Sequence, residues 1–102
     1  MKPKKDNLSN NLNKELFEAI ASINNVNEAQ KFFEDLCTPS ELQSMSDRWH
    51  VVKLLKEDLS YRKTQSLTNI SVTTIGRVAR ALTFGDGGYN IIYERLKNNK
   101  SK

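Results

Sequence analysis

The segment from Ser60 to Leu82 constrains the fold most, because it carries the signals of two short helices joined by a tight turn. Ser60 and Ser71 are each suited to cap a helix that begins at the next residue. Asn69 stands where such a turn usually has Gly, and Asn is one of the few other residues that tolerate the left-handed conformation. The pattern predicts a helix-turn-helix over residues 60–82, with the first helix ending near Thr68.

The second helix of this pair has an apolar side and a polar side. Its apolar residues recur at helical spacing and predict a face that packs against Leu67, with Ile70 inside the turn; they are Ile75, Val78, Ala79 and Leu82. The remaining side chains point outward, and they are Thr73, Thr74, Arg77 and Arg80. Gly76 lies in mid-helix, where Gly costs about 1 kcal/mol relative to Ala. Either something approaches the backbone closely at Gly76, or the residue reflects sequence drift.

The same segment carries charge of only one sign. No Asp or Glu occurs from Leu59 to Gly85, whereas Arg62, Lys63, Arg77 and Arg80 are basic. The whole chain has 16 Lys and Arg against 12 Asp and Glu, so these four residues account for the net charge of +4. A basic helix pair in an otherwise neutral chain favours DNA binding. Thr can reach base edges, and Arg can bind phosphate or guanine.

Two alternatives remain for the basic pair. The first is an ordinary helical hairpin whose basic side chains are merely solvated. The second is a helical protein-interaction module whose basic face binds an acidic partner. The capped turn, the acid-free stretch and the apolar pattern together favour DNA over the solvated hairpin. A basic face suits an acidic partner equally well, so the interaction module remains the main alternative.

The rest of the chain predicts an all-α fold of about six helices. At 102 residues the chain fits one small domain, which we place at residues 12–97. Apolar spacing and polar breaks predict helices over residues 12–23, 26–36, 39–57 and 89–97 in addition to the helix pair. Residues 1–11 and 98–102 are polar and charged, and we expect mobile tails there.

The helix over residues 39–57 has more than one apolar face. Thr38, Pro39 and Glu41 form a strong start signal. One apolar stripe contains Leu42, Met45, Trp49 and Val52, and a second contains Val51, Leu54 and Leu55. A chain this small has few other elements to cover both stripes. Either a second copy covers one of them, or the helix is central and wrapped by its own neighbours.

Several classes of function are excluded by composition. Cys37 and His50 are the only residues of their types, so we expect no disulfide and no protein-built metal site, and no cofactor. Neither a Ser-His-Asp nor a Cys-His arrangement is plausible, which excludes the common enzymes that use them. The segment FGDGGY lacks the Lys-Ser/Thr of a phosphate-binding loop. Neither a membrane-length apolar run nor a signal-peptide centre occurs, so we expect a cytoplasmic protein.

With these features in place, the segment LCTPSELQSMSDRWHVVKLLKEDLSYRKTQSLTNISVTTIGRVARAL resembles the Trp repressor family. The Thr-Pro helix start, the S-Y-R opening, T-T-I-x-R-V and the exit FGDGGY are most similar to its YerC/YecD branch. The resemblance covers about residues 36–96. It implies an intertwined homodimer and a sequence-specific, DNA-binding transcriptional regulator, most simply a repressor, that binds a palindromic operator in bacteria.

The resemblance also implies roles for particular residues. The positions that match its DNA-contacting residues are Arg62, Gln65, Ser71, Val72, Thr73 and Thr74, beside the outward Arg77 and Arg80. In tryptophan-binding members two Arg enclose the indole, and their counterparts are Arg48 and Arg77; Thr38 matches a residue near the ligand's amino group. A small Gly and a Ser of those members are replaced by Val78 and Ala81. The effector is therefore expected to be another small molecule, or absent, instead of L-tryptophan.

Overall fold

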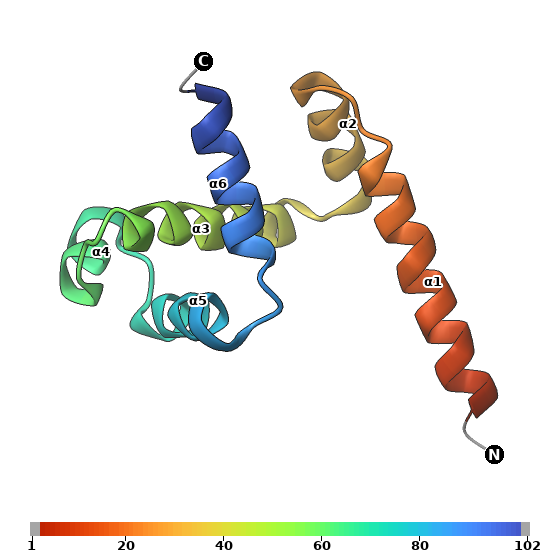
Figure 1. Ribbon diagram of the computed structural model, residues 1–102, viewed down its shortest axis with the longest axis horizontal. Coiled ribbons are helices and arrows are strands. Elements are labelled where there is room, and N and C mark those ends of the chain that lie inside the picture. Colours follow the sequence, from red (N-terminus) through yellow and green to blue (C-terminus); the bar gives the residue numbers. More distant parts are fainter. Residues whose placement is uncertain (1–2, 101–102) are drawn as a thin grey trace. The chain divides into compact units, whose positions relative to one another are not determined.

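The computed structural model describes residues 3–100 and contains six α-helices joined by short connections (Figure 1). This arrangement confirms the predicted all-α class. In chain order the helices are α1 (Pro3–Ala21), α2 (Val26–Leu36), α3 (Pro39–Lys56), α4 (Tyr61–Thr68), α5 (Val72–Phe84) and α6 (Gly88–Lys100).

The terminal helices extend further than the sequence pattern predicts. Helix α1 begins at Pro3, although residues 1–11 were predicted as a mobile tail and the helix was expected from Leu12. Pro is well suited to the first turn of a helix, and no breaker follows it before Ala21. Helix α6 likewise continues to Lys100, beyond the predicted end at residue 97. The parts of the predicted tails at residues 1–2 and 101–102 lie outside the described residues.

The chain divides into two compact units, with the boundary between Pro39 and Ser40. The predicted single domain over residues 12–97 spans both. In the first unit, Asn25 caps α2 by accepting a hydrogen bond from the Glu28 amide at 2.9 Å, and the Glu28 carboxylate accepts one from the Asn24 amide at 3.0 Å. None of the side chains described from residue 9 to residue 39 is buried. The second unit contains α4 to α6 and all of α3 except its first residue, Pro39, and it holds the core.

The core of the second unit forms where α5 packs against α3. Val51 and Val52 of α3 and Ile75 and Val78 of α5 are all at most 1% exposed. Half-buried residues surround them, namely Trp49, Leu55, Ile70, Leu82 and Tyr89. The Trp49 and Tyr89 rings lie 6.5 Å apart, so the base of α6 joins the same cluster. These contacts fix the orientation of α5.

The inner face of α4 differs from the sequence-based prediction. Leu67 was expected to pack against α5, but 59% of its surface is exposed, while Thr64 is fully buried. Thr64 and Thr68 are four residues apart and therefore lie on the same side of the helix, which leaves Leu67 to one side. The Thr64 hydroxyl has no hydrogen-bond partner among the described residues.

The turn between α4 and α5 has the predicted geometry. Asn69 adopts the left-handed conformation with φ of 60°, and its amide donates a 2.7 Å hydrogen bond to the Gln65 carbonyl. The Thr68 hydroxyl donates to the Thr64 carbonyl at 2.7 Å and accepts from the Ile70 amide at 3.1 Å. Thr68 therefore ties the end of α4 to the residue that leads into α5.

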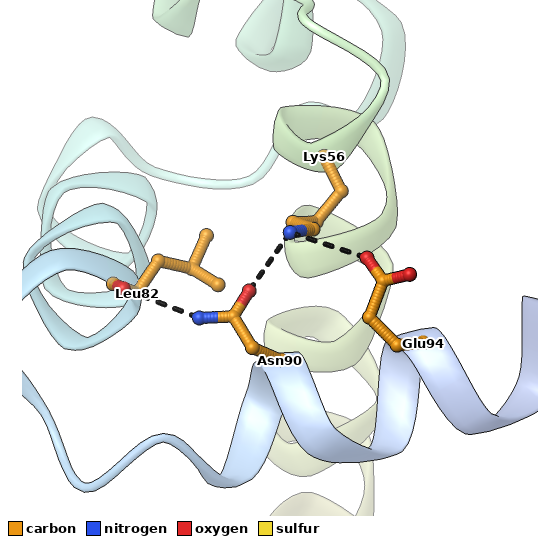
Figure 2. Close-up of polar contacts among 4 residues, drawn as sticks. All are labelled: Lys56, Leu82, Asn90 and Glu94. Atoms are coloured by element: carbon orange, nitrogen blue, oxygen red, sulfur yellow. Dashed lines mark hydrogen bonds and ion pairs between the residues drawn. The ribbon is translucent and has the colours of Figure 1, made fainter.

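A polar cluster holds α6 against the ends of α3 and α5 (Figure 2). The Lys56 ammonium donates a 2.8 Å hydrogen bond to Asn90 Oδ1 and lies 3.6 Å from the Glu94 carboxylate. The amide nitrogen of Asn90 donates, over a longer 3.4 Å, to the Leu82 carbonyl. Lys56 also lies 5.5 Å from the centre of the Tyr93 ring. Asn90 thus connects the last turn of α5 to α3.

Replacing Thr64 and Thr68 by Val should change stability in opposite directions. Thr64→Val removes a buried hydroxyl without a partner and should raise the free energy of unfolding by about 1 kcal/mol. Thr68→Val makes the same chemical change but removes two hydrogen bonds, and should lower it by about 1–2 kcal/mol. Urea unfolding at one fixed protein concentration measures both. A loss of stability in Thr64→Val would contradict this account of the core.

Asn90→Ala should lower the free energy of unfolding by about 1–3 kcal/mol, because it leaves the half-buried Lys56 ammonium without its shortest partner. Glu94→Gln should change it by less than about 0.5 kcal/mol, since the 3.6 Å ion pair involves a side chain that is 52% exposed. The same unfolding measurement compares the two variants. Equal losses would contradict this account, because the ion pair would then contribute as much to holding α6 as the Asn90 hydrogen bond does.

Candidate nucleic-acid interface

The helix-turn-helix presents nearly all of its predicted contact residues on the surface. Seven of the eight predicted positions are exposed, namely Arg62, Gln65, Ser71, Val72, Thr73, Arg77 and Arg80. No ion pair in residues 3–100 involves the basic residues of α4 or α5. Their charges therefore remain available to an anionic partner.

The first turns of α4 and α5 are both suited to bind phosphate. Ser60 caps α4 by accepting a 3.0 Å hydrogen bond from the Lys63 amide, and Ser71 caps α5 by accepting one of 3.2 Å from the Thr74 amide. Neither first turn contains an acidic residue. The remaining free amides and the positive end of each helix dipole favour a nearby anion.

An exposed strip runs along α5. Gly76 is four residues after Val72 and three after Thr73, and Arg80 follows four residues later, so these four positions follow one side of the helix. Val72 is 55% exposed although it is apolar. An exposed Val beside a Thr is the kind of surface that contacts a thymine methyl in the major groove. We call Val72, Thr73, Gly76 and Arg80 the exposed strip, in which Gly76 is itself half-buried and the other three residues are exposed.

Thr74 lies differently from its neighbour Thr73. Its side chain is half-buried, and its hydroxyl accepts a 3.2 Å hydrogen bond from the Ser71 hydroxyl. Thr74 lines a cleft of about 120 Å³ between α3 and α5, together with Ser44, Asp47, Arg48 and Arg77. The structure therefore turns Thr74 towards α3, while the sequence pattern had grouped it with the outward residues.

The cleft brings together the two Arg residues that the sequence comparison paired. Arg48 comes from α3 and Arg77 from α5, and both line it. Asp47 adds a carboxylate to the same cleft. Val78, which the sequence placed beside a possible ligand, is instead 1% exposed and belongs to the core. Thr38 lies between α2 and α3 and is exposed.

Sequence reasoning assigned no contact role to some exposed residues next to the interface, although it counted Lys63 among the basic residues. Tyr61 and Lys63 are exposed in the first turn of α4, beside Arg62. Their position directly after the Ser60 cap could have predicted a contact role, because side chains there surround the free amides of the first turn. Phe84 is 81% exposed at the end of α5 and lines a shallow groove of about 270 Å³ that includes Arg77 and Arg80.

The part of the chain that the structure describes contains no cluster of three or more His, Cys, Asp or Glu side chains able to hold a metal ion. No helix within it combines the length and the apolar character needed to cross a membrane.

The chain is similar to known proteins in both sequence and structure. The chain is 36% identical to the uncharacterized protein YerC of Bacillus subtilis (strain 168) over 88 residues, which is 86% of this chain and 85% of that protein. It is similar to the crystal structure of a TrpR-like protein from Eubacterium eligens ATCC 27750, with a TM-score of 0.77 and 43% identity over 82% of this chain and 87% of that one.

A second solved structure, of a candidate Trp repressor from Staphylococcus aureus, gives a TM-score of 0.78 and 39% identity over 82% of this chain and 84% of that one. The family described as Trp repressor protein matches residues 11–97, which include all of the interface residues named above. The chain therefore belongs to the Trp repressor family.

Proposed function

We propose that this protein is a cytoplasmic, homodimeric transcriptional regulator that binds a palindromic DNA operator through α4 and α5, most simply as a repressor. Proteins of the family are regulators and not enzymes. The observation that carries the proposal is the exposed, acid-free surface of the helix-turn-helix, on which four basic residues have no carboxylate partner within residues 3–100. The positive charge of such a surface complements the negative charge of the DNA backbone.

Different residues of this surface take different roles. Arg62 and the first turn of α4 contact phosphate, with Tyr61 and Lys63 beside them, and Gln65 lies further along the same helix. Val72 and Thr73 read base edges in the major groove, next to Ser71 at the start of α5. Arg80 lies one turn beyond Gly76 and binds phosphate or guanine. Thr74 stabilises the start of α5 from the cleft side, because its hydroxyl accepts a hydrogen bond from the Ser71 hydroxyl.

A homodimer is supported by the apolar surface that one chain leaves exposed. Only four hydrophobic side chains are buried among the described residues. Ile91 and Ile92 of α6 are 55% and 43% exposed, on the side of the helix away from Asn90 and Tyr93. Met45 of α3 is also 39% exposed, so the neighbours of α3 do not cover its stripes fully. A second copy would cover these faces and place two recognition helices in successive major grooves, about 34–36 Å apart.

The size of the cleft between Arg48 and Arg77 limits which effector one chain can hold. Small-molecule pockets usually measure roughly 300–1,000 Å³, whereas the cleft between Arg48 and Arg77 measures about 120 Å³. Its lining is largely charged, with Asp47 present besides the two Arg. Within one chain the cleft fits a small polar group, and L-tryptophan is too large for it. We propose that Arg48 and Arg77 serve a small anionic effector or a DNA phosphate.

Arg62→Ala and Thr73→Ala should affect DNA binding in different ways. Arg62→Ala should weaken binding to every sequence and reduce the slope of log affinity against log salt by about one unit, the amount for one lost phosphate contact. Thr73→Ala should instead relax the preference at one base position, with little change in the salt slope. Fluorescence anisotropy with labelled duplexes at several salt concentrations measures both effects.

Thr74→Ala is the matched control for Thr73→Ala, since it makes the same change at the neighbouring residue that faces the cleft. It should leave base preference nearly unchanged. A larger loss of preference from Thr74→Ala than from Thr73→Ala would contradict the assignment of the exposed strip.

Ile92→Glu should shift the protein from two chains towards one, because the new carboxylate would be buried against the second copy without a partner. Sedimentation equilibrium gives the mass of each species directly. Asn99→Glu adds the same charge at the exposed end of the same helix and should leave the mass unchanged. A single-chain mass for the wild-type protein at micromolar concentration would remove the dimer from the proposal.

A further inference from the structure

Gly76 stands in the middle of α5, where glycine weakens a helix. Two other glycines of the chain are explained by the chain itself. At Gly85 a Cβ atom would lie 2.5 Å from the Ala81 carbonyl oxygen, and Gly87 has φ of 89°. At Gly76, by contrast, an added Cβ would meet nothing within 4 Å, and φ is not positive. Neither packing nor backbone conformation within the chain therefore requires a glycine at this position.

The position of Gly76 on α5 indicates why a glycine is needed there. Gly76 is the central member of the exposed strip, with Val72 and Thr73 one turn before it and Arg80 one turn after. Ile75 and Val78 point the other way, into the core. The strip is the side of α5 that, under the proposed function, faces the major groove.

The dimensions of the groove make a missing side chain useful there. The major groove is about 12 Å wide, and a helix with its side chains is about 10–12 Å across, so a recognition helix nearly fills the groove. Without a Cβ, the backbone of α5 presents a shallow depression at the centre of the strip. Base-pair edges on the groove floor can then reach van der Waals contact with the helix backbone, and Val72 and Thr73 can approach the same floor.

We propose that Gly76 is a specificity-determining residue, whose missing side chain lets α5 approach the base edges closely in the specific complex. This inference rests on the proposed function. It concerns base readout and not charge, so it predicts an effect on specific binding alone. Non-specific affinity is set by phosphate contacts, which Gly76 does not make.

A size series at this position tests the proposal. Gly76→Ala should raise the unfolding temperature by about 4–8 °C, because Ala favours the helix and meets no neighbour. It should also lower affinity for a duplex that wild-type protein enriches from a random pool, by roughly tenfold, the loss expected for one good base contact. Gly76→Met, another strong helix former with a longer side chain, should lower that affinity further. Affinity for a random duplex of equal length should stay within about twofold for both variants.

Controls separate DNA approach from other causes. Asn13→Ala also introduces a better helix former, at an exposed position of α1, and should leave specific affinity unchanged. Sedimentation of Gly76→Ala should give the wild-type mass, because the residue faces DNA and not the second copy. A change in mass, or a lower unfolding temperature, would overturn the proposal, since Gly76 would then be needed for packing.

The outcome for DNA binding distinguishes this inference from the proposed function. If wild-type protein prefers its enriched duplex and Gly76→Ala binds that duplex equally well, this inference fails and the proposed function stands. If wild-type protein binds all duplexes alike, the proposed function fails, and the inference fails with it. A selective loss of specific affinity in a more stable variant would support both.

Discussion

The packing of Ile75 and Val78 on Val51 and Val52 is the contact on which the rest of the second unit depends, because it sets the direction of α5. Such buried side chains contribute about 1.5–3 kcal/mol each, and this chain buries only four of them among its described residues. A core this small leaves much of the positioning to polar contacts. Thr68 fixes the turn into α5 and Asn90 holds its last turn, so both ends of α5 are tied to the unit.

Helix α5 has three faces with different surroundings. One face enters the core, and a second, with Thr74 and Arg77, lines the small cleft beside α3. The third is the exposed strip. Because the faces are separate, a change on one of them should leave the others largely intact. Arg77 is the exception, since it lies between the cleft and the groove that contains Arg80 and Phe84. It is the residue through which an anion in the cleft would most directly influence that groove.

Local signals were enough to predict much of this fold. Helix α4 begins and ends where its caps at Ser60 and Asn69 indicated, because capping depends on residues only a few positions apart. Helix α2 covers the residues 26–36 that its apolar spacing predicted. The errors arose where tertiary packing decides. The rotation of α4 about its own axis buries Thr64 and leaves Leu67 exposed. Apolar spacing alone does not determine this rotation. The contact between Lys56 and Asn90 spans 34 positions in the chain and has no local signal.

The start of α1 was missed for another reason: polarity was taken as a sign of mobility, although polar residues form helices readily.

The central claim is that this basic surface reads DNA sequence as a symmetric dimer. Selection from a random duplex pool with purified protein at near-physiological salt tests it most directly, because non-specific binding is weak there, at roughly 10⁻⁴ to 10⁻⁶ M. The account predicts enrichment of a palindrome whose half-sites lie about one helical turn apart. An unenriched pool would contradict it, and the four unpaired basic residues would then be better explained by an acidic protein partner.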